Sequence, residues 1–120
     1  MILDDIKKKL EEIDPLVYYG AVPPLTEEEK ELSSAWNYIV FNRTSIKKSS
    51  NGTSYSKYFE VHVVRENFVP EDMDIEVREK MTSIAGMKDA GVDVTFDYIT
   101  KPNTQEVVEM MTLTFVKARK

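Results

Sequence analysis

Residues 42–57, NRTSIKKSSNGTSYSK, form a polar segment with four cations. They contain no acidic residue and lie between two runs rich in β-branched and aromatic residues, AWNYIVF at 35–41 and KYFEVHVVR at 57–65. Such runs favour strands, and a pair such as Asn51-Gly52 is typical of a hairpin turn. The sequence therefore predicts an antiparallel hairpin whose polar middle, residues 42–57, extends beyond the sheet. We call this middle the arm.

Hydrophobic periodicity predicts a helix on each side of this hairpin. Apolar residues recur at helical spacing over residues 2–13, and Pro15 ends that pattern. A second apolar stripe begins after Pro70 and stops at Gly86. Its members are Met73, Val77, Met81 and Ile84.

The segment between the first helix and the hairpin has two interpretations. Residues 16–22, LVYYGAV, fit either an edge strand or an extended strap that crosses the core. Further on, Thr26 followed by Glu29 resembles a capping box, which predicts a brief helix through about residue 32.

A second hairpin is predicted near the C-terminal end. Apolar and polar residues alternate over 92–98, Lys101-Pro102-Asn103 makes a turn, and the chain returns over 107–117. These elements predict an α+β fold in one domain, residues 1–120. In it, two helices pack on one face of a mainly antiparallel four-stranded sheet that carries the long hairpin arm. The expected core includes Trp36, Tyr38, Val61, Val63, Phe96 and Phe115.

Composition and charge narrow the classes of function. Cysteine is absent, so disulfides, thiolate metal sites and cysteine nucleophiles are excluded. No run is apolar enough for a signal peptide or a membrane span, and we expect no membrane partner. The net charge of −5 is uneven, because residues 32–65 carry five bases against one acid and the segments on either side are acidic. Faces of opposite sign suit contacts between subunits, although an ordinary solvated surface can give the same pattern.

No constellation typical of catalysis, a cofactor or a metal is present in the sequence. His62 is the only histidine, and no nucleophile or further ligand is spaced for it, so a structural role is favoured over an enzyme that uses it. The acidic pairs are contiguous and typical of helix starts. The four glycines are too dispersed for a phosphate-binding loop. We therefore expect no enzyme, no cofactor and no metal.

Nucleic-acid binding is the alternative that the arm itself raises. Its cations lie beside Tyr55 and Tyr58, and basic arms with aromatic residues can follow a phosphate backbone. The chain as a whole is acidic, with a pI of about 4.9. Four charges on one arm would bind weakly in a single copy, and a ring of copies would bind more strongly. A small nucleic-acid-binding regulator thus remains open.

The order helix, long hairpin, helix, hairpin, together with the polar arm and the basic ending TLTFVKARK, resembles the tail-terminator and tail-completion proteins of long-tailed bacteriophages. These small subunits cap the tail tube and join it to the head. The resemblance implies a ring, expected to be a hexamer, in the tail or neck of the virion and in the host cytoplasm during assembly. The implied partners are further copies of the chain, the tail tube protein and the head–tail connector protein, with non-specific contact to DNA in the ring lumen.

The resemblance implies that the arm and the basic end make these contacts. Acids of a neighbouring subunit, such as those at 27–29, would complement the cations of the arm. The residues assigned to interaction are Arg43, Ile46, Lys47, Lys48, Asn51, Gly52, Tyr55, Lys57, Lys117, Arg119 and Lys120.

Overall fold

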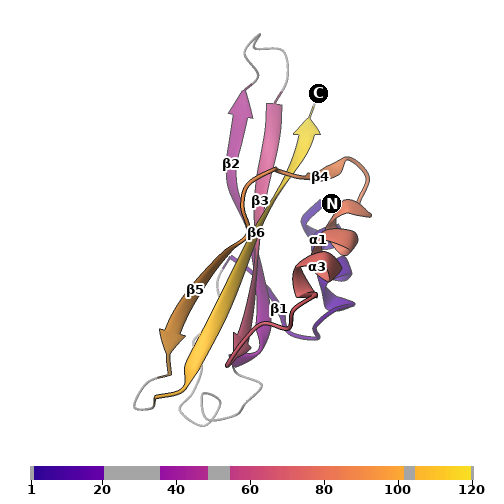
Figure 1. Ribbon diagram of the computed structural model, residues 1–120. Helices are drawn as coiled ribbons and strands as arrows, with labels where there is room; N and C mark the ends of the chain where they lie inside the picture. The colour runs from indigo at the N-terminus through magenta and orange to yellow at the C-terminus, as the bar shows by residue number, and fades with distance from the viewer. Residues whose placement is uncertain (1, 21–35, 49–54, 102–104, 120) are drawn as a thin grey trace.

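The computed structural model describes residues 2–20, 36–48, 55–101 and 105–119, and Figure 1 shows how their helices and strands are arranged. The helices are α1 (Ile2–Glu11) and α3 (Met73–Thr82). The strands are β1 (Val17–Tyr19), β2 (Tyr38–Lys48), β3 (Tyr55–Glu66), β4 (Met87–Asp89), β5 (Thr95–Thr100) and β6 (Val107–Arg119).

The strands form one six-stranded mixed sheet in the order β1-β2-β3-β6-β4, and β5 also pairs with β6. β2, β3 and β6 are the long central strands and are antiparallel to one another. β1 is parallel to β2, with Val17 opposite Ile39. β4 and β5 pair with two different stretches of the same side of β6, residues 115–117 and 107–112.

The α+β class and the two helices are confirmed, but the expectation of a four-stranded, mainly antiparallel sheet is wrong. The two additional strands, β1 and β4, are three residues long each. Such short segments have too few residues to show an alternating pattern, and they are strands only because a longer strand offers them hydrogen-bond partners. Of the two interpretations of residues 16–22, the edge strand is the observed one over Val17–Tyr19, and residues 21 and 22 lie outside the described residues.

The core lies between one face of the sheet and the two helices, which cover that face side by side (Figure 1). α1 contributes Ile6 and Leu10, and α3 contributes Val77 and Met81, all fully buried. The predicted apolar stripes of both helices therefore face the sheet. The central strands supply alternate residues, as period-two strands must. These are Ile39, Phe41, Phe59, Val61, Val63, Met111, Leu113 and Phe115.

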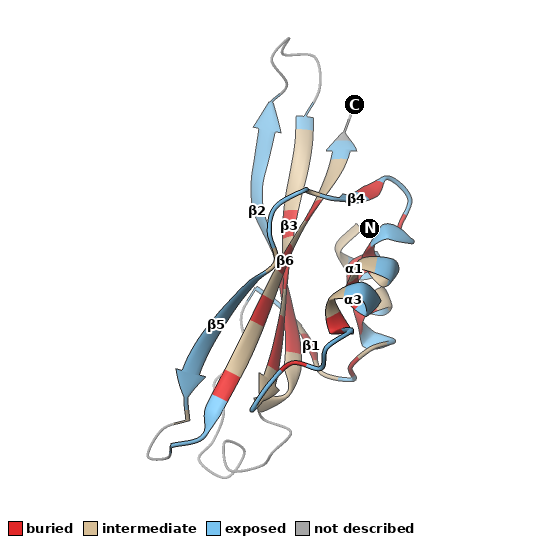
Figure 2. Cartoon of the chain, in the orientation of Figure 1, coloured by how far each residue is buried: buried red, intermediate tan, exposed pale blue. Residues whose placement is uncertain are grey.

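The expected core placement of Phe96 is wrong. All six residues of β5 are exposed, and Phe96 itself is 47% exposed. β5 begins at Thr95 and pairs only with β6 at the margin of the sheet, so no further strand or helix covers it among the described residues. Figure 2 shows exposed residues along the whole of β5 and along the upper part of β2.

The long strands give the molecule an elongated shape of 52 × 26 × 23 Å. β2, β3 and β6 continue past the helices toward one end (Figure 1). The described part of the arm is thus built of strands, as predicted. Asn51, Gly52 and Lys120, the acids at 27–29 and the expected helix that begins at Thr26 lie outside the described residues.

Candidate interaction surface

The C-terminal part of β6 adds a third strand to the two strands of the arm. Beyond Phe41, β2 continues to Lys48 and pairs with β3, while the C-terminal part of β6 pairs with the other side of β3. Tyr55 lies opposite Arg119, and Lys57 lies opposite Lys117. The basic end of the chain, about 60 residues away in sequence, is therefore paired with the arm.

Two rows of residues cross the sheet at the end that carries the arm. They lie on the same face that α1 and α3 cover nearer the middle of the sheet. One row is Ile46, Lys57 and Lys117, and the next holds Lys48 beside Tyr55. Lys57 is two residues from the buried Phe59, which fixes the face on which both rows lie. We call these five residues the basic platform.

The basic platform places two like charges side by side. Lys57 and Lys117 are directly opposite each other on neighbouring strands, and like charges in that position destabilise a sheet. Lys117 donates a hydrogen bond from Nζ to the carbonyl oxygen of Ala85 at 2.9 Å. Neither residues 42–57 nor residues 115–119 contain an acid, so no carboxylate within these segments neutralises the platform.

A β-bulge decides which side chains belong to the platform. Arg43 pairs with Phe59 and Ser45 pairs with Tyr58, so Thr44 is the extra residue. After the bulge, even-numbered residues of β2 lie on the helix-side face. Ile46 is consequently placed beside Lys57, although it is 54% exposed.

The remaining cations of the arm make specific contacts on their own subunit. Arg43 donates from Nε to the hydroxyl oxygen of Tyr19 at 2.9 Å. On the face opposite the helices, Lys47 Nζ lies 4.8 Å from the ring centroid of Tyr58, a cation–π distance. A shallow hollow of about 270 Å³ is lined by Arg43, Ile46 and Tyr58 among others. Tyr58 was noted beside the cations of the arm in the sequence, whereas Tyr19 was missed, because only the pairing of β1 with β2 brings it to this surface.

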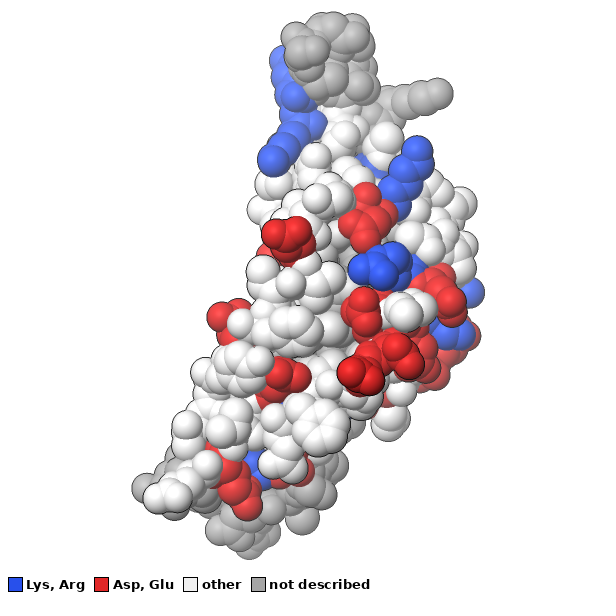
Figure 3. Space-filling model, in the orientation of Figure 1, with Lys and Arg blue, Asp and Glu red and all other residues white. Residues whose placement is uncertain are grey.

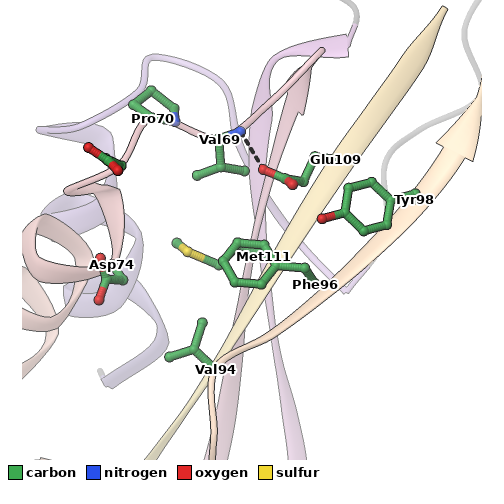
Figure 4. Close-up of a pocket in the computed structure, with 9 residues that line it drawn as sticks. Val69, Pro70, Asp74, Val94, Phe96, Tyr98, Glu109 and Met111 are labelled. Carbon is green, nitrogen blue, oxygen red and sulfur yellow. Dashed lines mark hydrogen bonds between the residues drawn. The ribbon is translucent and has the colours of Figure 1, made fainter.

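A groove lies on the same face of the sheet as the helices, between α3 and β5 (Figure 4). Its volume is about 440 Å³, and its walls include Val69, Val94, Phe96 and Met111. Three carboxylates, those of Glu71, Asp74 and Glu109, also line it. We call it the acidic groove. Sequence reasoning missed this site, because Glu71 and Asp74 around the start of α3 meet Glu109 of β6 only through the tertiary structure.

Glu109 is fixed at the sheet side of the acidic groove by the backbone. The N–H of Val69 donates to Glu109 Oε1 at 2.7 Å. A hydrogen bond with Glu109 is the main reason that the pKa of Tyr98 is raised above its ordinary value. Phe96 and Tyr98 thus border an anionic site, and Figure 4 shows them across the groove from Asp74.

Charged side chains are unevenly distributed over the face of the molecule that Figure 3 shows. Lys and Arg side chains gather at the upper end beside β2, whereas Asp and Glu side chains lie along β5 and, interspersed with Lys and Arg such as Arg78, over α3. Figure 3 thus shows on the surface the alternation of sign that the sequence indicated. The basic upper end and the acids along β5 lie at different levels of the sheet on one molecule.

His62 is held by neutral partners on the sheet face opposite the helices. Its Nδ1 lies 2.9 Å from Thr112 Oγ1, and its Nε2 lies 3.0 Å from Asn42 Oδ1. Burial lowers the pKa of the imidazole from 6.5, against smaller opposing effects of Glu60 and Asp97. These contacts suit a neutral ring that donates to Asn42 and accepts from Thr112. No group of acids or histidines able to hold a metal ion occurs in the described residues.

The chain matches no protein-family model and shows no significant similarity to a curated protein. Within the described residues, neither helix has the length and apolar character needed to cross a membrane.

Proposed function

We propose that the protein is a non-enzymatic virion assembly subunit that forms a ring, terminates the tail tube of a long-tailed bacteriophage and joins the tail to the head. The observation that carries the proposal is the basic platform at one end of an elongated subunit. Lys57 and Lys117 face each other there without a neutralising acid in either segment. Repulsion between these two lysines would be relieved by an acidic surface on a neighbouring protein, so their placement suits a protein that binds such a partner.

Two further features support an assembly role. β5 presents a strand edge with exposed aromatic and apolar side chains, of which Tyr98 and Ile99 are 62% and 55% exposed. Soluble proteins usually protect such edges, because they pair readily with other chains. Histidine, the residue most often used as a general base, occurs once and is surrounded by structural partners. The proposed location is the tail or neck of the virion, and the host cytoplasm during assembly.

The proposal is tested by the mass of the assembled species. Static light scattering across concentration, with and without a tail tube protein, should give a mass that is a whole multiple of 13.9 kDa, and electron microscopy should show rings. A monomer under all of these conditions would contradict the proposal.

A nucleic-acid-binding regulator is the second candidate, and the proximity of Tyr55 to Lys48 and Lys57 favours it. Aromatic rings beside cations can stack on bases while the cations contact phosphates. Fluorescence anisotropy with single- and double-stranded DNA at several salt concentrations separates the candidates. Tight binding by a dilute monomer, with a steep loss of affinity as salt rises, would favour the regulator. Binding that occurs only for the assembled species would favour the ring.

A further inference from the structure

Two strand edges are open among the described residues, and they are of similar length. β1 covers β2 only as far as Phe41, so no strand of the described residues pairs with the edge of β2 from Asn42 to Lys48. On the opposite side of the sheet, the outer edge of β5 is unpaired from Thr95 to Thr100. Both stretches span about 20 Å at about 3.3 Å per residue.

The direction of the strands allows these edges to meet without inverting a subunit. β2, β3, β6 and β5 are successive neighbours, and each is antiparallel to the next. A further copy of β2 placed beside β5 in the same orientation is therefore antiparallel to β5. All copies related in this way point in one direction, as rotational symmetry requires.

The side chains of the two edges are complementary. Ile46 and Lys48 lie on the helix-side face, as do Phe96 and Tyr98, which pair with Met111 and Glu109. In a continuous sheet, Ile46 of one copy would lie against the apolar wall of the acidic groove of the next. Lys48, which lies on the same face as Ile46, would then approach the carboxylates on the α3 side of that groove.

We propose that the β2 edge, residues 42–48, of one copy adds to the β5 edge, residues 95–100, of the next copy, so that Ile46 enters the acidic groove. The partner is thus a second copy of this chain, bound by strand addition. This inference rests on the proposed ring and names the contact that would build it. Because the two surfaces differ, the contact is head-to-tail, and it gives either a closed ring or an open filament.

The offset between the two edges sets the strand tilt that a closed ring would need. Ser45, the midpoint of residues 42–48, pairs with Tyr58, which pairs with Val116 of β6, whereas the midpoint of β5 lies opposite residues 109–110, about seven residues along β6. That offset is about 23 Å over four strand spacings of about 4.8 Å each, which corresponds to a strand tilt of about 50°. This tilt is steeper than the tilt of about 35–45° in closed barrels.

Cross-linking tests the contact directly, because the chain contains no cysteine. The double variant Ile46→Cys/Phe96→Cys, treated with a short bismaleimide, should give a ladder of covalent oligomers. The same treatment of Ile46→Cys/Ile75→Cys is the matched control, since Ile75 on α3 is 47% exposed, as is Phe96. We expect at least about tenfold more cross-linked product from the first pair, the ratio that corresponds to about 1.4 kcal/mol.

The outcomes separate this contact from the proposed function. Wild-type protein that assembles by light scattering, with cross-linking of the Ile46→Cys/Phe96→Cys variant no greater than that of the control, would overturn the proposed contact and leave the ring. Wild-type protein that stays monomeric, with and without the tail tube protein, would overturn both. Mixing the two single variants adds a check: cross-links between Ile46→Cys and Phe96→Cys chains, with none within either variant alone, would confirm the head-to-tail contact.

Discussion

Asp14 is the one buried charged residue in the described core, and it joins the end of α1 to the sheet. Its Oδ2 lies 2.8 Å from Arg65 Nη2, with side chains 8% and 14% exposed respectively. Its Oδ1 accepts a hydrogen bond from the backbone N–H of Leu16 at 2.9 Å. The same side chain therefore links the segment just before β1 to β3.

We expect Asp14→Ala to lower the free energy of unfolding by about 3–5 kcal/mol, because it leaves the Arg65 guanidinium partly buried without its counter-ion. Chemical denaturation measures this change. Glu11→Ala is the control, since Glu11 is exposed on the same helix and should change stability by no more than about 0.5 kcal/mol. Equal effects of the two substitutions would show that the Asp14–Arg65 pair is not structurally important.

His62 predicts a pH dependence of stability. Its pKa in the folded protein is below 6.5, so the unfolded chain binds more protons in the range just below that value. The contribution of the neutral imidazole to folding stability is complete above pH 6.5. It declines as the pH falls from 6.5, the pKa in the unfolded chain, through the lower pKa in the folded protein. Thermal unfolding midpoints of wild type should therefore fall more between about pH 7 and pH 5 than those of His62→Asn. Parallel pH profiles would contradict this assignment.

Among the elements, the two halves of the arm differ in hydrogen bonding. Residues 55–59 of β3 have partners on both sides, whereas residues 42–48 of β2 have a partner on one side only among the described residues. Alternate amides of an antiparallel edge strand point away from the sheet. In an isolated subunit, amide hydrogen exchange should be slow over residues 55–59 and fast at alternate positions of 42–48. Uniform slow exchange along β2 would mean that another segment covers its edge.

The arm also predicts a separation of folding from assembly. Replacing residues 45–56 by a short turn removes Ile46, Lys47, Lys48 and Tyr55 but no buried residue of the described core. The thermal midpoint should change little, because the lost strand pairs are exposed. Light scattering should show loss of the assembled species. If the shortened protein still assembles at normal yield, the arm is not part of the interface.

At the scale of the whole molecule, charge complementarity predicts a salt-dependent assembly. Lys47→Glu/Lys48→Glu should weaken assembly at low salt, and the effect should shrink as salt rises, since exposed charges are screened within about 8 Å at physiological ionic strength. Folding stability should barely change. Lys7→Glu/Lys8→Glu on the exposed face of α1 is the matched control, because it alters the net charge equally.

A compensating change identifies the partner of the reversed lysines. Because Lys48, unlike Lys47, lies on the face of the acidic groove, Glu71→Lys/Asp74→Lys should partly restore assembly of the single variant Lys48→Glu if the neighbour is another copy of this chain. Rescue that arises only from changes in a tail tube or connector protein would instead place the arm at a contact between different proteins. If the lysine reversal leaves assembly unchanged at low salt, electrostatic attraction by these lysines does not contribute to assembly.

The amino-acid sequence by itself determined the long hairpin, both helices and the polarity of the arm. These features are encoded locally: β-branched runs favour strands, the stripe of Met73, Val77 and Met81 has helical spacing, and the run of cations in 42–57 needs no neighbour to be recognised. The candidate residues Lys57 and Lys117 were likewise visible as charges, but their opposition across two strands was not.

Long-range pairing was needed to establish the size and mixed character of the sheet, the bulge at Thr44 and the acidic groove. Each depends on pairing between segments distant in sequence, and a shift of one residue in register exchanges the two faces of a strand. Phe96 illustrates the physical reason: its alternating pattern predicts a strand with an apolar face, but burial requires a partner layer over that face. β5 lies at the margin of the sheet, where the described residues of its own chain leave Phe96 partly exposed.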